Sequence, residues 1–192
     1  MGKIRSIIKS IVVISFSWFL ALGALVVTVG TVEAQPADDT AVSVETTYLK
    51  NIRQVTSGFV KAGEGYFSPD ATQIIYQAIT KGYPFYQIYT QPLAGGRPRM
   101  LSTGRGRTTC SYFSLDGKRI MYSSSHTDPQ MTETEQAEIK QQVEDRKNGV
   151  RRRYSWPFDP HTDIYVADLD GNILKRLTTA DGYDAEGAYS SD

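Results

Sequence analysis

The sequence predicts an all-β chain of repeated four-stranded antiparallel units, interrupted by one helix. Three observations support this prediction. A short aromatic segment that contains Ser and Asp occurs three times, at residues 66–70, 112–116 and 188–192. The segments that follow it are short and rich in Ile and Tyr, as is typical of half-buried strands. Turn-forming residues separate these segments at regular intervals.

The repeat has a fixed spacing. Phe67 and Phe113 lie 46 residues apart, whereas Leu101 and Leu177 lie 76 residues apart, so the second unit carries 30 extra residues. Several independent segments share each offset, which makes chance similarity a poor explanation. Four short strands in about 45 residues is the period of a β-propeller blade. We therefore predict that residues 48–192 form a partial β-propeller with about two complete blades and the start of a third.

The first unit shows the expected strands most clearly. Its four predicted strands are residues 66–68, 74–77, 86–91 and 99–102. Pro69 and Asp70 predict a turn that joins the first two strands as a hairpin, because Pro presets the backbone angle and Asp can bond to the backbone further on. In the second unit, Asp170-Gly171 is a strong two-residue hairpin signal.

These residues resemble a known repeat. Tyr-Phe-Ser-Pro-Asp at 66–70, with Asp-Ile-Tyr-Val at 163–166 and Arg-Leu-Thr at 176–178, resembles the TolB-like (WD40-like) propeller repeat. Leu115 and Ser191 stand where that repeat has Pro. The resemblance implies a propeller fold in an exported protein. The repeat occurs in the periplasmic protein TolB, which binds other envelope proteins, and in the propeller domains of prolyl-oligopeptidase-like and tricorn-like peptidases.

Residues 1–34 predict a targeting segment. The chain begins with three basic side chains, Lys3, Arg5 and Lys9. An apolar run over residues 11–30 follows, and then short side chains that fit signal-peptide cleavage after Ala34. The run is also long enough to remain as an uncleaved membrane anchor. The polar residues 35–47 read as a linker, so we expect a periplasmic or secreted protein with N-terminal membrane association as the alternative.

Residues 127–158 interrupt the second unit between its second and third strands. Within them, Thr132–Gly149 predicts a helix, with Thr132 and Glu135 as a capping box and Gly149 as the stop. Its apolar side chains are few. They are Ala137, Ile139, Val143 and Val150. We expect a mostly solvated helix that contacts the sheets through this thin apolar stripe.

The segment after the helix is a candidate binding patch. It contains three consecutive basic residues, Arg151, Arg152 and Arg153. Together with Trp156 they could bind an anion or a protein partner. The alternative, which we favour, is that Trp156 and Phe158 hold the loop against the sheets while the arginines stay solvated. The formal net charge is zero, so nucleic acid is not an expected partner.

Two similar segments bracket the insertion, His126-Thr127-Asp128 and His161-Thr162-Asp163. Their side chains could form a hydrogen-bonded network or bind a divalent cation. No spacing matches a zinc motif, so we predict no metal site. Arg105 and Arg107 lie in the loop between the two units and could face a binding surface, because propeller loops carry function.

The sequence offers little for catalysis. It contains no Gly-x-Ser-x-Gly, P-loop, dinucleotide-binding or His-Glu-x-x-His motif, and no cofactor is expected. The single cysteine, Cys110, rules out an intramolecular disulfide. We therefore predict a non-catalytic module that binds envelope or periplasmic proteins. The alternative is the N-terminal propeller of a peptidase whose catalytic domain is missing from this chain. Because a propeller closes with at least about four blades, we also expect the sequence to be a fragment. The alternative is closure by oligomerisation, in which identical chains supply the missing blades.

Overall fold

The computed structural model describes residues 48–153 and 155–191. Residues 51–191 belong to one compact unit. The predicted targeting segment, residues 1–34, and the predicted linker, residues 35–47, lie outside the described residues. Within the part that is described, no helix is long and apolar enough to cross a membrane.

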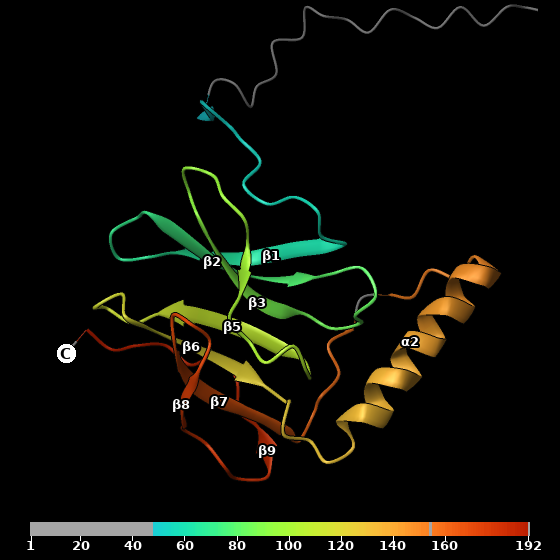
Figure 1. The fold of residues 1–192 in the computed structure, drawn as a ribbon. Helices are drawn as coiled ribbons and strands as arrows, with labels where there is room; N and C mark the ends of the chain where they lie inside the picture. The colour runs from blue at the N-terminus through green and yellow to red at the C-terminus, as the bar shows by residue number, and fades with distance from the viewer. Residues whose placement is uncertain (1–47, 154, 192) are drawn as a thin grey trace, which may run out of the picture. The chain divides into compact units, whose positions relative to one another are not determined.

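Two mostly antiparallel sheets make up the fold, one of four strands and one of five (Figure 1). The first sheet has the order β1-β2-β3-β4, with β1 (Lys61–Phe67), β2 (Gln73–Ile79), β3 (Gln87–Pro92) and β4 (Arg99–Met100). The second has the order β5-β6-β7-β8, with β5 (Thr108–Phe113), β6 (Arg119–Ser124), β7 (His161–Asp168) and β8 (Ile173–Arg176). Helix α2 (Met131–Asn148) lies between β6 and β7 in the sequence. The predicted all-β class with one inserted helix is confirmed.

The two sheets begin with the same hairpin turn. Ser68 Oγ donates to Asp70 Oδ1 at 2.6 Å, and Ser114 Oγ donates to Asp116 Oδ1 at 2.5 Å. In each turn the same carboxylate oxygen also accepts from the backbone amide two residues further on, at 3.1 and 3.0 Å. Leu115 takes the place of the proline without changing this pattern, because the Ser and Asp side chains define the turn.

The main core contains residues of both sheets. Its buried members are Ile75, Ile88, Leu101, Phe113, Ile120, Tyr122, Tyr165 and Ala167. A smaller cluster contains Tyr76 and Tyr89, and the ring of Phe59 packs edge-on against both of them. The segment before β1 therefore covers part of the first sheet with an aromatic contact.

The repeat extends to the connection that leaves each sheet. The Thr108 amide donates to the Tyr86 carbonyl at 3.2 Å, and the Asp184 amide donates to the Thr162 carbonyl at 2.9 Å. Donors and acceptors are both 76 residues apart, which is the offset of the sequence repeat. The chain after the second sheet thus follows the course of the chain after the first.

The third copy differs from its prediction, because residues 188–191 form no strand. The regular segment in this region is instead β9 (Gly182–Tyr183), which pairs in parallel with β7. Both β1 and β5 pair with the strand that follows them. Residues 184–191 have no such partner among the described residues, which accounts for the missing strand. They still follow the same backbone path. Glu64, Cys110 and Glu186, at equivalent repeat positions, have φ values of 51°, 54° and 60°.

Helix α2 begins and packs differently from its prediction. Its N-cap is Gln130, without a side-chain capping bond, so the capping box of Thr132 and Glu135 is wrong. Gly149 ends the helix in the left-handed conformation as predicted, with φ 66°. The apolar contact stripe is also wrong, because its four side chains are exposed. The buried side chains of the helix are Met131 and Glu135.

Candidate functional site

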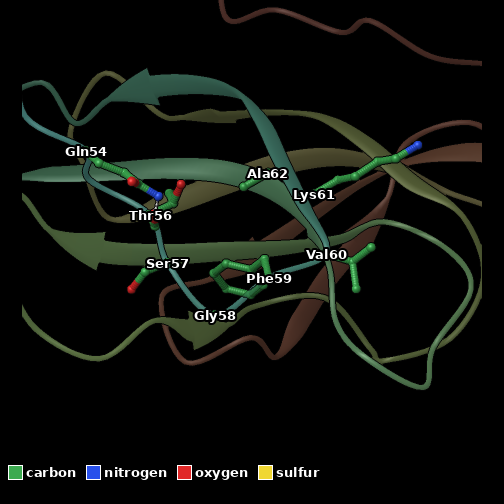
Figure 2. Close-up of a pocket in the computed structure, with 8 residues that line it drawn as sticks. All are labelled: Gln54, Thr56, Ser57, Gly58, Phe59, Val60, Lys61 and Ala62. Carbon is green, nitrogen blue, oxygen red and sulfur yellow. Dashed lines mark hydrogen bonds between the residues drawn. The ribbon is translucent and has the colours of Figure 1, made fainter. Parts of the chain in front are cut away.

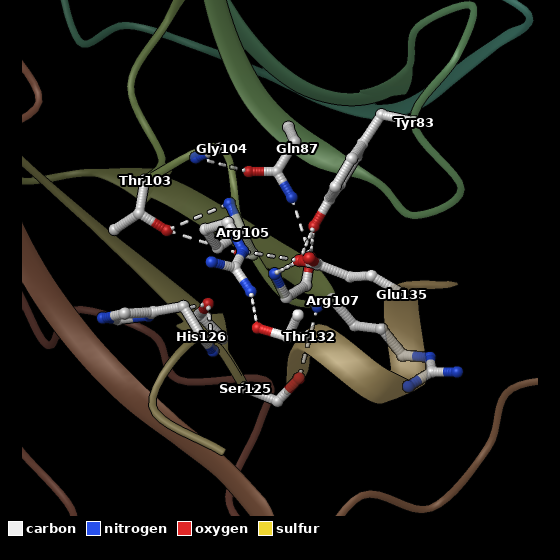
Figure 3. Close-up of polar contacts among 12 residues, drawn as sticks. Tyr83, Gln87, Thr103, Gly104, Arg105, Arg107, Ser125, His126, Thr132 and Glu135 are labelled. Atoms are coloured by element: carbon white, nitrogen blue, oxygen red, sulfur yellow. Dashed lines mark hydrogen bonds and ion pairs between the residues drawn. The ribbon is translucent and has the colours of Figure 1, made fainter. Parts of the chain in front are cut away.

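Three loops meet at the end of the sheets that carries α2 (Figures 1 and 3). They are the β2–β3 loop, residues 80–86, the loop between the sheets, residues 101–107, and the start of the insertion, residues 125–135. We call this the helix end of the molecule. Most of the candidate residues predicted from the sequence lie here.

The centre of the helix end is Glu135. Its Oε1 atom accepts hydrogen bonds from Tyr83 Oη at 2.7 Å, Arg105 Nε at 2.9 Å and the Gly106 amide at 3.1 Å. The Glu135 residue is only 9% exposed. One carboxylate oxygen therefore joins the helix to two separate loops, and Figure 3 shows the three donors converging on it.

Electrostatics favour the ionised form of Glu135. Burial alone raises the pKa of this carboxyl group, but the hydrogen bonds from Arg105, Tyr83 and the Gly106 amide outweigh burial, so the pKa is lowered overall. The pKa of Tyr83 is raised, first by burial and then by its hydrogen bond to Glu135. The contact is therefore a buried carboxylate that accepts from a neutral phenol and a guanidinium.

Arg105 explains why the capping box does not form. Its Nη2 atom donates to Thr132 Oγ1 at 2.9 Å, while its Nε atom donates to Glu135. Both side chains of the predicted box are thus occupied by a residue from the loop between the sheets. The guanidinium group makes charge-assisted bonds to both side chains, and such bonds are among the stronger hydrogen bonds in proteins.

Gln87 fixes the same loop from the side of the first sheet. Its Nε2 atom donates to the Gly106 carbonyl at 2.8 Å, and its Oε1 atom accepts from the Gly104 amide at 3.0 Å. Gln87 is 2% exposed, so these bonds are shielded from water. The loop is held at both its backbone amides and its carbonyl groups.

Gly106 allows the loop to approach the start of the insertion. A Cβ atom at this position would lie 2.6 Å from the His126 amide nitrogen, and the φ angle is +72°. A side chain would therefore meet both a steric clash and an unfavourable backbone conformation.

Arg107 faces inward. Its guanidinium carbon lies 4.0 Å from the centre of the Phe85 ring, and its Nη1 atom lies 3.7 Å from Asp159 Oδ2. From the sequence, Arg105 and Arg107 were predicted as residues that could face a binding surface. The structure places both in contacts that connect the loops with the insertion.

The two His-Thr-Asp segments meet through one pair. His161 Nε2 lies 3.7 Å from Asp128 Oδ1, so the two ends of the insertion are adjacent. The His126 ring instead packs on the Tyr165 ring, with centroids 4.4 Å apart. Asp163 is fully buried, and it pairs with Arg176 Nη2 at 2.5 Å.

The side chains of the two segments thus take part in separate contacts, and only His161 and Asp128 face each other across the insertion. The pKa of His126 is lowered, first by burial and then by the charge of Arg176. Among the described residues, no three His, Cys, Asp or Glu side chains are grouped so as to hold a metal ion.

Trp156 holds the return of the insertion against the sheets. Its ring stacks on Tyr86 with centroids 6.4 Å apart, and its Nε1 atom donates to Tyr183 Oη at 2.5 Å. The Phe158 ring lies 5.5 Å from the Tyr183 ring but remains 72% exposed. The contacts of Trp156 agree with the favoured interpretation, whereas Phe158, which is mostly exposed, adds little to holding the loop.

The three arginines before Trp156 have different surroundings. Arg152 bridges two acids of α2, with distances of 2.6 Å to both Glu138 Oε1 and Asp145 Oδ2. Arg151 and Arg153 are exposed, and they have no ion pair within the described part of the chain. The predicted arginine patch is thus divided into one residue that braces the helix and two that face solvent.

A shallow groove of about 290 Å³ lies elsewhere, along the segment before β1 (Figure 2). Residues 54 and 56–62 line it, and Lys61 is its one charged side chain. Because few polar groups converge there, this groove has fewer groups that could bind a ligand than the helix end has.

Comparisons with known proteins identify no relative by sequence. No protein-family model and no curated protein matches the chain. Among solved structures, the chain is similar to a protein provisionally identified as TolB from Agrobacterium tumefaciens, with 17% sequence identity and a TM-score of 0.43. The match covers 67% of this chain and 38% of that one, so the chain spans well under half of that structure's length. At this level the match carries no argument about function.

The sequence analysis missed Tyr83 and Gln87, and it gave Glu135 the wrong role. Tyr83 and Glu135 are 52 residues apart, and no local pattern connects them. The signal at Glu135 was its place in a helix-start motif, which points to a local bond. Its actual partners come from two other loops.

Proposed function

We propose that this chain is a non-catalytic protein-binding module, and that its partner surface is the helix end. The observation that carries the proposal is the way α2 is attached. A buried carboxylate, Glu135, holds the helix. The apolar side chains Ile139 and Val143 therefore do not have to pack against the sheets. Ile139 and Val143 lie one turn apart on the helix and are 40% and 51% exposed. A rigidly held helix with exposed apolar residues is a common form of protein-binding surface.

The titratable groups at this end support binding over catalysis. Glu135 accepts three hydrogen bonds, Asp163 is paired with Arg176, and His126 is packed on an aromatic ring. The internal contacts of these groups are those of a framework that positions loops.

Photo-crosslinking in the organism's own cells tests this function. A photoreactive phenylalanine analogue replaces Val143 on α2, and a second strain carries it at Leu115, which is 60% exposed in the β5–β6 turn at the opposite end. We expect discrete cross-linked protein adducts from position 143 and none from position 115. Equal adducts from both positions, or none from position 143, would contradict the proposal.

The cellular location forms part of the proposal. The basic and apolar start of the sequence supports export, and an exported binding module would meet envelope or periplasmic proteins. Fractionation of cells that produce the full chain checks this. Recovery in the cytoplasmic fraction would contradict export.

The peptidase alternative makes a separate prediction. It requires a Gly-x-Ser-x-Gly domain encoded directly downstream of residue 192. Further repeats followed by a stop codon would exclude the alternative, and a hydrolase domain there would replace the purely binding function.

A further inference from the structure

A second, larger groove lies at the opposite end of the first sheet from α2. Its volume is about 550 Å³, which is within the range of small-molecule sites. It lies between the β1–β2 turn and the β3–β4 turn. The residues that line it are Thr72, Gln73, Thr90, Gln91, Pro92, Ala94, Arg97 and Arg99. The lining contains two arginines and no carboxylate.

The positive charge of this groove is only partly compensated. Arg97 is exposed and has no hydrogen bond or ion pair within the described part of the chain. Arg99 Nη1 lies 2.8 Å from Asp170 Oδ1, but the two side chains are 51% and 78% exposed, so this pair is weak. A third guanidinium, that of Arg53, donates to the Leu93 carbonyl in the same turn. Asp70, in the adjoining β1–β2 turn, already accepts from Ser68 and Thr72.

Neutral donors complete the lining. Gln73 Oε1 accepts a hydrogen bond from Thr90 Oγ1 at 3.2 Å, which directs the amide oxygen towards the protein. The Gln73 amide nitrogen has no hydrogen-bond acceptor in the described part of the chain. An amide nitrogen beside two guanidinium groups is a set of donors that matches an oxyanion.

The β3–β4 turn positions Arg97. Gly95 and Gly96 have φ angles of +108° and +150°, which side-chain-bearing residues rarely adopt. A Cβ atom at Gly96 would lie 3.2 Å from Pro92 Cδ, so the turn folds closely over the end of β3. Pro98 then restricts the backbone on the other side of Arg97.

Two side chains of the groove have no counterpart of the same chemistry in the second sheet. With the offset of 76 residues, the equivalents of Thr90 and Arg97 in the second sheet are Val166 and Ile173. The second sheet therefore lacks both the hydroxyl group and the unpaired guanidinium. A feature required only for folding would be expected in both sheets, because they share the same turns and strand order.

We propose that this groove binds a small anionic molecule, about the size of a phosphorylated monosaccharide, with its oxyanion held by Arg97 and Arg99. Arginine forks bind phosphate and carboxylate oxygens through paired hydrogen bonds. This site is separate from the helix end, so it does not depend on the protein-binding function proposed above.

Calorimetry on the full chain tests the site with four probes: glucose 6-phosphate, gluconate, inorganic phosphate and glucose. We expect saturable binding of glucose 6-phosphate and a loss of about tenfold or more in affinity in the Arg97→Gln variant. Comparing glucose 6-phosphate with gluconate distinguishes a phosphate from a carboxylate ligand, and either one binding in an Arg97-dependent way supports the proposal. The control is Lys175→Gln, the position equivalent to Arg99 in the second sheet, which should bind as the wild type does.

Three results would overturn the proposal. The first is that none of the three anions binds. The second is that glucose binds as tightly as glucose 6-phosphate. The third is that Arg97→Gln and Lys175→Gln weaken binding equally, which would indicate a diffuse effect of charge. Because Arg97 is exposed and unpaired, its replacement leaves the fold intact, and a thermal melt confirms this for each variant.

Discussion

Glu135 Oε1 accepts a hydrogen bond from Arg105 Nε at 2.9 Å, and this contact connects the inserted helix to the loop between the two sheets. The same oxygen accepts from Tyr83, which lies in the loop of the first sheet. A buried polar contact thus holds the first turns of α2, together with Met131 and the bond from Arg105 to Thr132, where an ordinary surface helix would use an apolar face. Breaking this contact should change the helix end more than any change on the outer surface of the helix.

Replacing Glu135 by Ala should destabilise the protein by about 2 kcal/mol, because the Tyr83 hydroxyl and the Gly106 amide lose their acceptor in a buried place. Urea unfolding measures the change. Glu133→Ala, the same exchange at an exposed position in the first turn of α2, should cost no more than about 0.5 kcal/mol. Equal losses in the two variants would mean that the Glu135 contact does not hold the helix.

The Glu135 contact should weaken in acid. Its pKa is lowered in the folded protein, so the contact stabilises the fold fully above the ordinary glutamate pKa of about 4.3. That stability is lost as the pH falls through the lower, folded-state pKa. Asp70 and Asp116 have lowered pKa values and add stability of the same sign, so the useful comparison is with Glu135→Gln. Between pH 5 and pH 2, the free energy of unfolding of that variant should depend less on pH than the free energy of unfolding of the wild type. The same pH dependence in both proteins would contradict the stabilising role of the ionised Glu135 side chain.

Gly106→Ala should be strongly destabilising. The new Cβ atom would clash with the His126 backbone, and the left-handed φ angle adds strain, so a loss of about 3 kcal/mol is expected. Gly58→Ala is the matched control, because Gly58 has a similar φ of +80° and no atom within 4 Å of the added carbon. That variant should cost about 1 kcal/mol, for the backbone alone. Thermal melts of both variants measure the loss of stability. Similar losses in the two variants would show that the loop can move away from His126.

Trp156 and Tyr183 should be energetically coupled. Trp156 Nε1 donates to Tyr183 Oη, so Trp156→Phe and Tyr183→Phe each remove one half of the same bond. A double-mutant cycle by urea unfolding should give a coupling energy of about 1 kcal/mol. Strictly additive losses would show that the bond contributes nothing to holding the insertion.

Much of the fold could be predicted because the residues that repeat in the sequence form local turns. In Ser68-Pro69-Asp70 and Ser114-Leu115-Asp116 the bonds that define the hairpin join residues two apart, so the sequence pattern and the structure coincide. The helix between β6 and β7 could be predicted for the same reason. Its flanking strands matched the first unit on both sides.

The site could not be predicted in the same way. Thr132 and Glu135 fit a local capping rule, but the guanidinium of Arg105 binds both of them across about 30 residues of sequence. The predicted strand near Tyr189 failed for a related reason. A strand requires a neighbouring strand to pair with as well as a suitable pattern, and among the described residues no strand follows residues 184–191 as β2 follows β1 and β6 follows β5.

The most direct test of the helix end as a binding surface combines the Glu135 contact with the exposed side chain of Val143. The photoreactive analogue at position 143 is introduced into the wild-type chain and into the Glu135→Ala variant, and the yield of protein adducts is compared at equal amounts of folded protein. If Glu135 holds α2 in its binding position, the adducts should fall by about tenfold or more in the variant, and Glu133→Ala should leave them unchanged. Adducts of the same yield in the wild type and in Glu135→Ala would contradict the account.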